Sequence, residues 1–213
     1  MRSFFYFIFL LGFTQLSMGQ TSLKAKQLLD KVSETMSSYV NIYFEFTYTL
    51  NNKKEGIRQE TSGNLTVQGE QYKLYYLDVI QILNEGKVYT IVPENEEVTI
   101  LNENEEESNF GINPKKLLYF YQSGYDYQWD VRQRLSGRTI QFVKLIPSNE
   151  NEEVKYLLLG IDTKVNHIYK LIEVGKNDTQ TTLTIRKQKE NVVLDADFFD
   201  FKLEDYPDYY IIE

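Results

Sequence analysis

Cysteine is absent from this chain of 213 residues, and histidine occurs only once. Without cysteine the protein cannot form disulfides, so its stability has to come from a hydrophobic core. The same absence excludes a thiol nucleophile. It also excludes a lipid anchor of the bacterial lipoprotein type, because that anchor is attached to a cysteine behind the export signal.

Groups suited to catalysis are sparse as well. The single histidine, His167, alternates with Val165, Tyr169 and Leu171, a pattern typical of a strand residue near a turn. The chain has no Gly-x-Ser-x-Gly motif and no glycine-rich phosphate loop. Its acidic stretches lack the Asp/Asn spacing and the glycine of a calcium loop. We therefore expect no enzyme activity, no catalytic residue, no metal site and no cofactor.

Positive charge is also in short supply. The 23 Lys and Arg residues stand against 31 Asp and Glu, which gives a net charge of −8. Nucleic-acid binding needs a basic patch that neutralises phosphates, and no such patch stands out. Nucleic acid is therefore not an expected partner. The acidic balance is typical of proteins that dock on basic surfaces, and it is equally common for plain solubility.

The first nineteen residues have the features of an export signal. Arg2 is their only charge, residues 4–13 are almost entirely apolar, and Ser17-Met18-Gly19 has small residues at the positions that signal peptidase recognises. A membrane anchor would need about 20 apolar residues, and this run is shorter. We expect a signal peptide over residues 1–19 and a single exported, soluble and untethered domain over residues 20–213.

Behind the signal, the hydrophobic pattern predicts one long helix followed by many strands. Residues 22–39 have Leu28, Val32 and Met36 on one stripe of an amphipathic helix. From residue 41 the period changes to two, which predicts a half-buried antiparallel strand over residues 41–50. Further strands are expected at residues 59–67, 72–77, 79–83, 87–92, 98–101, 128–133, 139–146, 154–162, 167–174 and 181–187, with a last pair around 199–201 and 209–212.

Short turns between so many strands favour a meander in one large antiparallel sheet that curls into a barrel or half-barrel, and a sandwich is the alternative architecture. Two segments interrupt the meander. Residues 102–109 crowd four glutamates into a solvated loop. Residues 113–121 begin with Asn113 and Pro114 and predict a short helix. The two helices are the only expected cover for the concave face of the sheet.

Several strands are apolar on both faces. Large residues stand on either side of the strand at 72–77, and Ile140 and Phe142 alternate with Val143 and Leu145. Such strands are covered twice, or are covered once and line a cavity. The spacing alone does not distinguish a filled interior from a hollow one.

Short motifs along the mature chain resemble those of the LolA family of periplasmic lipoprotein carriers. The similar stretches, in chain order, are Leu28-Leu29-Asp30-Lys31-Val32-Ser33, Phe44-Glu45-Phe46, Ser62-Gly63-Asn64-Leu65-Thr66-Val67, Asn84-Glu85-Gly86-Lys87-Val88-Tyr89 with Pro93 and Glu97-Val98-Thr99, Asn191-Val192-Val193-Leu194, and Phe198-Phe199-Asp200-Phe201 with Pro207. The absence of cysteine fits the soluble carrier rather than its lipid-anchored receptor relative.

The resemblance implies a mainly β (α+β) fold in which a large antiparallel sheet forms an unclosed half-barrel under a lid of about two or three helices. It also implies a periplasmic monomer that carries acylated lipoproteins from an inner-membrane lipoprotein-releasing transporter to an outer-membrane acceptor. One position departs from the family. Many members have an arginine just after the Gly-x-Leu-x-Val strand that helps to hold the lid shut, but here Gln68-Gly69-Glu70-Gln71 follows that strand. Lys73 is the nearest cation, and the lid-locking role does not transfer to it.

Candidate lipid-binding residues are the apolar ones on the strands and on the two lid helices. They are Leu28, Val32, Met36, Phe44, Phe46, Leu65, Val67, Leu74, Tyr76, Leu117, Leu118, Trp129, Ile140 and Phe142. A slip of one residue in register would exchange every choice on a strand. Two other functions stay open: a lipid-binding or stress-sensing module of the envelope on the same fold, and an enzyme acting on envelope lipids or glycans.

Overall fold

The structure is a computed structural model that describes residues 21–105, 120–149 and 153–213. The predicted signal peptide, residues 106–109 of the acidic loop and most of the second predicted helix, including Leu117 and Leu118, lie outside the described residues. Within the described part of the chain, no helix combines the length and the apolar character needed to cross a membrane.

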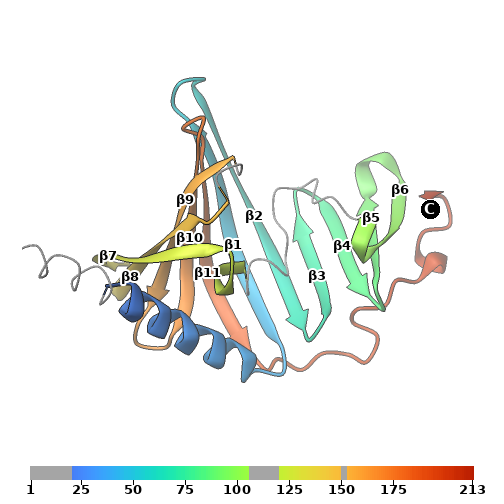
Figure 1. The fold of residues 1–213 in the computed structure, drawn as a ribbon. Coiled ribbons are helices and arrows are strands. Elements are labelled where there is room, and N and C mark those ends of the chain that lie inside the picture. The colour runs from blue at the N-terminus through green and yellow to red at the C-terminus, as the bar shows by residue number, and fades with distance from the viewer. Residues whose placement is uncertain (1–20, 106–119, 150–152) are drawn as a thin grey trace, which may run out of the picture.

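Twelve strands form one sheet in the order β12-β6-β5-β4-β3-β2-β1-β11-β10-β9-β8-β7 (Figure 1). The strands are β1 (Ile42–Asn52), β2 (Ile57–Gln68), β3 (Gln71–Tyr76), β4 (Val79–Asn84), β5 (Lys87–Val92), β6 (Glu97–Asn102), β7 (Tyr125–Leu135), β8 (Arg138–Pro147), β9 (Val154–Asp162), β10 (His167–Gly175), β11 (Gln180–Glu190) and β12 (Tyr210–Ile212). Short 3-10 turns lie at η1 (Pro93–Asn95), η2 (Glu103–Glu105), η3 (Phe120–Gln122) and η4 (Leu203–Asp205). The expected unclosed sheet is confirmed.

Strand β1 is the centre of this sheet. Its predicted alternation is present, with Ile42, Phe44 and Phe46 buried on one face. It pairs with β2 on one side and with β11 on the other, both antiparallel. The sheet therefore consists of two meanders, β1–β6 and β7–β11, joined through the β1–β11 pair.

Tight turns set the ends of several strands. Leu77 and Asp78 both have positive φ, at 52° and 59°, and so connect β3 to β4 by a two-residue turn whose twist matches that of a hairpin. Glu85-Gly86 and Ser136-Gly137 repeat this geometry. The strand predicted over residues 72–77 therefore ends one residue early, at Tyr76.

One helix, residues 21–37, lies across the concave face of the β7–β11 half (Figure 1). Its inward stripe is fully or nearly fully buried and consists of Ala25, Leu28, Leu29, Val32 and Met36. This is the stripe that the period of 3.6 residues predicts. Burial of these side chains against the sheet, more than helix propensity, stabilises the helix.

Three expectations need correction. The described residues contain one α-helix rather than a lid of two or three, and of the second predicted helix they include only its end, in η3. The strand expected at residues 199–201 is wrong, because this segment runs as turns and coil on the convex face. The sheet is mixed and not purely antiparallel, since β12 pairs with β6 in parallel.

The convex face has its own cover. Ile82, Ile91 and Val98 form a second cluster, against which Phe201, Tyr206, Tyr209 and Ile211 of the C-terminal segment pack. The ring of Phe201 stacks on Tyr89 with centroids 4.6 Å apart. A third cluster, made of Ile140, Phe142 and Tyr169, lies on the convex side of β8 and β10. The C-terminal segment thus replaces the expected strand with aromatic packing.

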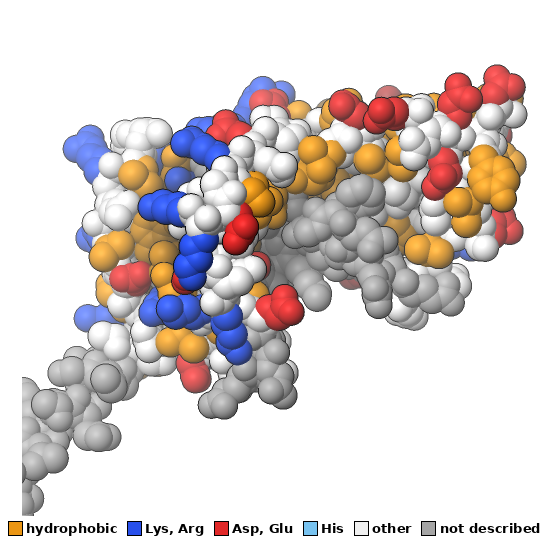
Figure 2. Space-filling model, turned by 90° about the horizontal axis from the view of Figure 1, so that it is seen from above, with side chains coloured by type: hydrophobic (Ala, Val, Ile, Leu, Met, Phe, Trp, Pro, Cys, Tyr) orange, Lys and Arg blue, Asp and Glu red, His pale blue; other side chains and the backbone are white. Residues whose placement is uncertain are grey.

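Charge is distributed unevenly over the molecule. Lys and Arg gather over the β7–β11 half, whereas Asp and Glu lie toward the opposite end (Figure 2). From residue 191 onward, seven Asp and Glu accompany a single cation, Lys202. The end that includes β6 and the C-terminal segment is therefore the acidic end.

We predict that Gly63→Ala lowers the free energy of unfolding by about 1–3 kcal/mol, the usual cost of overpacking a core. A Cβ at Gly63 would lie 2.5 Å from the carbonyl oxygen of Tyr75 and 2.7 Å from Cζ of Phe46. Urea unfolding measures the effect. The neighbouring exposed Ser62→Ala is the control and should change stability by less than about 0.5 kcal/mol. Equal stability of the two variants would contradict the packing described above.

Candidate functional site

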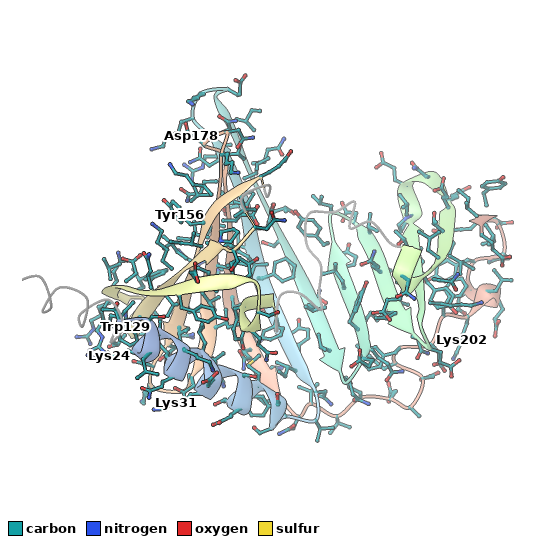
Figure 3. All side chains as sticks on the ribbon, in the orientation of Figure 1. Lys24, Lys31, Trp129, Tyr156, Asp178 and Lys202 are labelled. Carbon is teal, nitrogen blue, oxygen red and sulfur yellow. The ribbon has the colours of Figure 1, made fainter. Side chains whose placement is uncertain are left out.

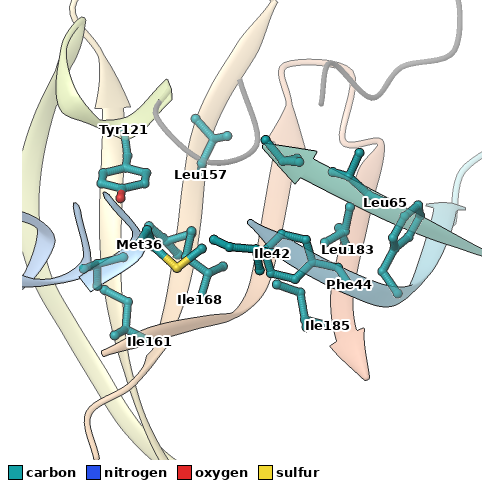
Figure 4. Packing of buried hydrophobic residues seen from close by; sticks show 14 of the residues in the cluster. Met36, Ile42, Phe44, Leu65, Tyr121, Leu157, Ile161, Ile168, Leu183 and Ile185 are labelled. Carbon is teal, nitrogen blue, oxygen red and sulfur yellow. The ribbon is translucent and has the colours of Figure 1, made fainter. Parts of the chain in front are cut away.

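The candidate site is the concave face of the sheet beneath the helix. One continuous apolar cluster joins the helix to strands of both meanders. Its buried members are Ala25, Leu28, Leu29, Val32, Met36, Ile42, Phe44, Phe46, Leu65, Val67, Tyr72, Leu74, Tyr76, Leu83, Val88, Tyr121, Val143, Leu145, Leu157, Leu159, Ile161, Ile168, Leu183 and Ile185. In Figure 4, Met36 of the helix points toward Ile168 and Ile161 of the sheet.

Most of the predicted lipid-binding residues come together in this cluster. It contains the three from the first helix and the six from β1, β2 and β3, namely Leu28, Val32, Met36, Phe44, Phe46, Leu65, Val67, Leu74 and Tyr76. Trp129 of β7 is partly buried and packs against the cluster, and Figure 3 shows it at the side of the molecule where the helix begins. Their binding of lipid stays a prediction.

Two predicted residues lie elsewhere. Ile140 and Phe142 belong to the convex cluster, because Val143 and Leu145 of the same strand occupy the concave face. Phe142 pairs with Gly160 of β9 and its ring covers that glycine, where a Cβ would lie 2.8 Å from the ring. The prediction that Ile140 and Phe142 face the concave side is therefore wrong. Adjacent residues of a strand point to opposite faces, so a shift of one residue exchanges the two sets.

Other members of the face were not singled out from the sequence. They are chiefly on β9, β10 and β11 and include Leu157, Leu159, Ile161, Ile168, Leu183 and Ile185. The run Leu157-Leu158-Leu159 is apolar on both faces, so its pattern does not indicate an inward side. Tyr121 is also buried in the cluster and points toward Met36 (Figure 4). It is the last residue of the segment 113–121, for which the sequence predicts a short helix.

Aromatic side chains form the floor of the site around a glycine. Gly63 of β2 pairs with Phe46 on one side and with Tyr76 on the other. Because Gly63 has no side chain, the two rings approach across β2 to 6.0 Å between centroids. Tyr48 stands edge-on to Tyr76 at 5.8 Å. Burial raises the pKa of Tyr76 to about 12, which indicates a poorly solvated surface.

Side-chain hydrogen bonds attach the helix and the residues behind it to other elements. Gln122 of η3 donates from Nε2 to Oγ of Ser33 on the helix over 2.7 Å. At the other end, the hydroxyl of Tyr39, two residues behind the helix, lies 2.8 Å from Nε2 of His167 on β10. Lys73 has a different role, because its Nζ lies 5.2 Å from the ring centre of Phe198 in the C-terminal segment. Lys73 therefore contacts the C-terminal segment, and we do not assign it the lid-locking role of the family's arginine.

The site is suited to binding apolar groups rather than to ionic chemistry. Its walls are aliphatic and aromatic. Burial raises the pKa values of Tyr48 and Tyr76, because it disfavours the charged phenolate. Within the described ranges, no group of three or more His, Asp or Glu side chains is placed to hold a metal ion. Long hydrocarbon chains are the ligand class that such a surface accommodates.

We predict that the stability of the protein falls as pH drops below about 6.5, the usual pKa of histidine. Burial lowers the pKa of His167, although Glu190 and Asp162 oppose the shift. The folded state therefore binds fewer protons than the unfolded state in this range, and the free energy of unfolding decreases with falling pH.

Since His167 is the chain's single histidine, NMR titration of its imidazole gives the pKa without ambiguity. Urea unfolding at about pH 7.5 and about pH 5.5 should show a smaller difference for His167→Asn than for the unmodified protein. A folded-state pKa at or above 6.5 would contradict the prediction.

No known protein family and no characterised protein matches the sequence. Solved structures do align. An uncharacterised conserved protein from Thermus thermophilus is 11% identical with a TM-score of 0.57, and the alignment covers 89% of this chain and 98% of that one. The Pseudomonas aeruginosa MucA/MucB complex aligns at 14% identity and a TM-score of 0.51, over 85% of this chain and 62% of that one.

A LolA superfamily protein from Nitrosomonas europaea aligns at 9% identity and a TM-score of 0.45, over 83% of this chain and 97% of that one. Identities this low concern the fold alone. Two of these structures have TM-scores above 0.5, the Thermus thermophilus protein and the MucA/MucB complex, and this chain shares its fold with the aligned chain of each.

Proposed function

We propose that this protein binds the acyl chains of lipoproteins between its helix and the concave face of the sheet and carries them across the periplasm. This proposal rests on the continuous apolar cluster that lies between the helix and the concave face of the sheet. The helix contributes one stripe of side chains to that cluster, and Ser33 of the helix accepts a hydrogen bond from Gln122 of η3. The residues behind the helix are tied more densely, through Tyr39 to His167 and through Val40 to Asn191. Such a cover can lift without disrupting the ladders of the sheet.

The energetics of transport favour a container of this kind. Each buried methylene contributes about 0.8 kcal/mol, so an acyl chain of about sixteen carbons in water loses on the order of 12 kcal/mol. Three such chains, fully buried, would exceed the practical ceiling of about 18–21 kcal/mol for non-covalent binding. A carrier that releases its cargo must therefore offset part of the gain.

The helix supplies this offset. Leu28, Leu29, Val32 and Met36 already bury their apolar surface against the sheet, and acyl chains that enter take their place. The free energy of binding is then the difference between the acyl-chain contact with the sheet and the helix contact that it replaces. It is smaller than the full free energy of transferring the acyl chain out of water. Uptake and release become exchanges between similar free energies, which suits a shuttle.

The acidic end of the molecule is the proposed docking surface for membrane partners. The proposed partners are an inner-membrane lipoprotein-releasing transporter and an outer-membrane acceptor. Seven acidic residues from position 191 onward accompany only Lys202 there, so a basic partner surface complements this end. The helix lies over the other half of the sheet (Figure 1), so a docked partner leaves it free to move.

A second candidate function is a lipid-binding or stress-sensing module of the envelope. The alignment with the MucA/MucB complex favours it, because that structure shows a protein of this fold bound to a protein partner. The alignment covers only 62% of the matched chain in that complex.

Mass spectrometry of lipid extracted from the natively produced protein tests the two functions. Triacylated lipoprotein supports the carrier, free phospholipid supports a general lipid-binding module, and protein that carries no lipid from its native host contradicts both.

We predict that locking the helix to η3 abolishes uptake of acylated lipoprotein. Because the chain has no cysteine, Ser33→Cys with Gln122→Cys creates a unique pair at the two residues that share a hydrogen bond. A short bis-maleimide then bridges them, and lipoprotein uptake is measured before and after bridging. Uptake at the normal rate by the bridged protein would sink the lid mechanism.

The matched control is a bridge at the hairpin tips far from the helix. Lys54 and Asp178 form an ion pair between the β1–β2 and β10–β11 turns, and Asp178 lies at the tip of the upright hairpins (Figure 3). Bridging Lys54→Cys to Asp178→Cys rigidifies the sheet without touching the cover. This variant should take up lipoprotein at the rate of the unbridged protein.

A further inference from the structure

The two strands β10 and β11 separate at one end of the sheet. Their ladder covers Lys170 to Val174 on β10 and Gln180 to Thr184 on β11. Beyond it, β11 continues from Ile185 to Glu190 paired with β1, while His167 and Ile168 of β10 pair with β9. Figure 1 shows β11 and the β9–β10 hairpin diverging there, with the helix passing across. The sheet therefore has a gap between residues 185–190 of β11 and residues 167–168 of β10, which we call the notch.

A cavity of about 460 Å³ lies in this notch. Ile168 and Ile185, both members of the concave cluster, line it from opposite strands. Gln188 and Glu190 line it too, and they pair directly with Phe44 and Ile42, whose side chains belong to that cluster. Cross-strand partners project from the same face, so the cavity opens next to the apolar site.

The polar lining of the notch is divided by charge. Oε1 of Gln188 is buried and has no hydrogen-bond partner among the described residues. Glu190 accepts a hydrogen bond from Nε2 of Gln188 at 3.0 Å, and its carboxylate lies 3.7 Å from Nδ1 of His167. The buried carboxylate of Asp162 lines the cavity as well, so the inner groups are acceptors and negative charges. Arg138 and Lys164, both exposed, line the same cavity and supply positive charge at its rim.

We propose that the notch binds the phosphoethanolamine headgroup of a phospholipid whose acyl chain lies on the concave face. This inference rests on the proposed acyl-chain site and adds a headgroup to it. The ammonium donates to Glu190 and to Oε1 of Gln188, and the phosphate lies toward Arg138 and Lys164. A zwitterionic headgroup carries both signs of charge, and the lining offers carboxylates inside and cations at the rim.

The orphan acceptor gives the site its selectivity. A buried acceptor without a donor costs free energy, and an ammonium group supplies that donor together with the charge that Glu190 requires. A phosphoglycerol headgroup shares the phosphate but has no positive charge for Glu190. Discrimination between the two headgroups therefore depends on the carboxylates of Glu190 and Asp162, while the rim cations serve both.

The test compares two lysolipids with the same acyl chain, lysophosphatidylethanolamine and lysophosphatidylglycerol, below their micellar concentrations. Calorimetric titration, supported by the fluorescence of the single tryptophan, gives each Kd. The expected result is an affinity about tenfold higher for the ethanolamine lipid, the worth of one charge-assisted hydrogen bond. Glu190→Gln should reduce this ratio, and Arg138→Gln should weaken the binding of both lipids alike.

Glu45→Gln is the matched control. Glu45 pairs with Lys187 on β11, the neighbour of Gln188 in the strand, and so lies on the opposite face. It should leave the ratio unchanged. Equal affinities for the two lipids would overturn the headgroup site and leave the acyl-chain site standing. Binding of neither lipid would overturn both, and competition by glycerophosphoethanolamine at equal concentration would show a site for soluble ligands instead of lipids.

Discussion

The sheet is open at both edges, and so its concave apolar face cannot be closed by the strands themselves. Strands β12 and β7 are the two ends of the strand order and are not paired with each other. A closed barrel would cover its interior by curvature, whereas this sheet needs another element to exclude water. The helix of residues 21–37 performs that role with five buried side chains. Among the described residues, the interior is therefore closed by side-chain contacts of the helix and of Tyr121 and not by backbone hydrogen bonds.

The two halves of the molecule each cover one apolar face of the sheet, but the covered faces are opposite. Over β7–β11 the helix covers the concave side, while over β4–β6 the C-terminal segment covers the convex side with stacked aromatic rings such as Phe201 on Tyr89. Tyr206 stacks in turn on Phe201 at 5.5 Å, so this cover is a chain of ring contacts. The C-terminal segment is thus tied along its length, whereas the helix is a separate element with few polar ties. Mobility is expected where the ties are few.

The sequence predicts how a segment is oriented only where one face of the segment is apolar and the other is polar. Residues 22–39 and 41–50 have one apolar side each, and both were placed correctly. On β8, Ile140-Gln141-Phe142-Val143 is apolar on both faces, so the pattern could not show that Phe142 covers Gly160 on the convex side. The alternation at residues 199–201 is typical of a strand, but tertiary stacking on Tyr89 overrides it. The parallel β12 and the separation of β10 from β11 depend on pairings distant in sequence, which no local pattern records.

The separation of β10 from β11 links closure of the helix to the notch. His167 lines the cavity and at the same time binds the hydroxyl of Tyr39, which follows the helix. Glu190 lies 3.7 Å from the other nitrogen of the same imidazole, so one ring connects the cover to the acidic side of the notch. A group that takes the carboxylate of Glu190 changes the charge facing that ring, and lifting the helix removes its Tyr39 partner. The proposed occupancy of the notch and the proposed opening of the helix therefore act on a shared residue, so we expect the two to be coupled, and any coupling free energy is the same in both directions.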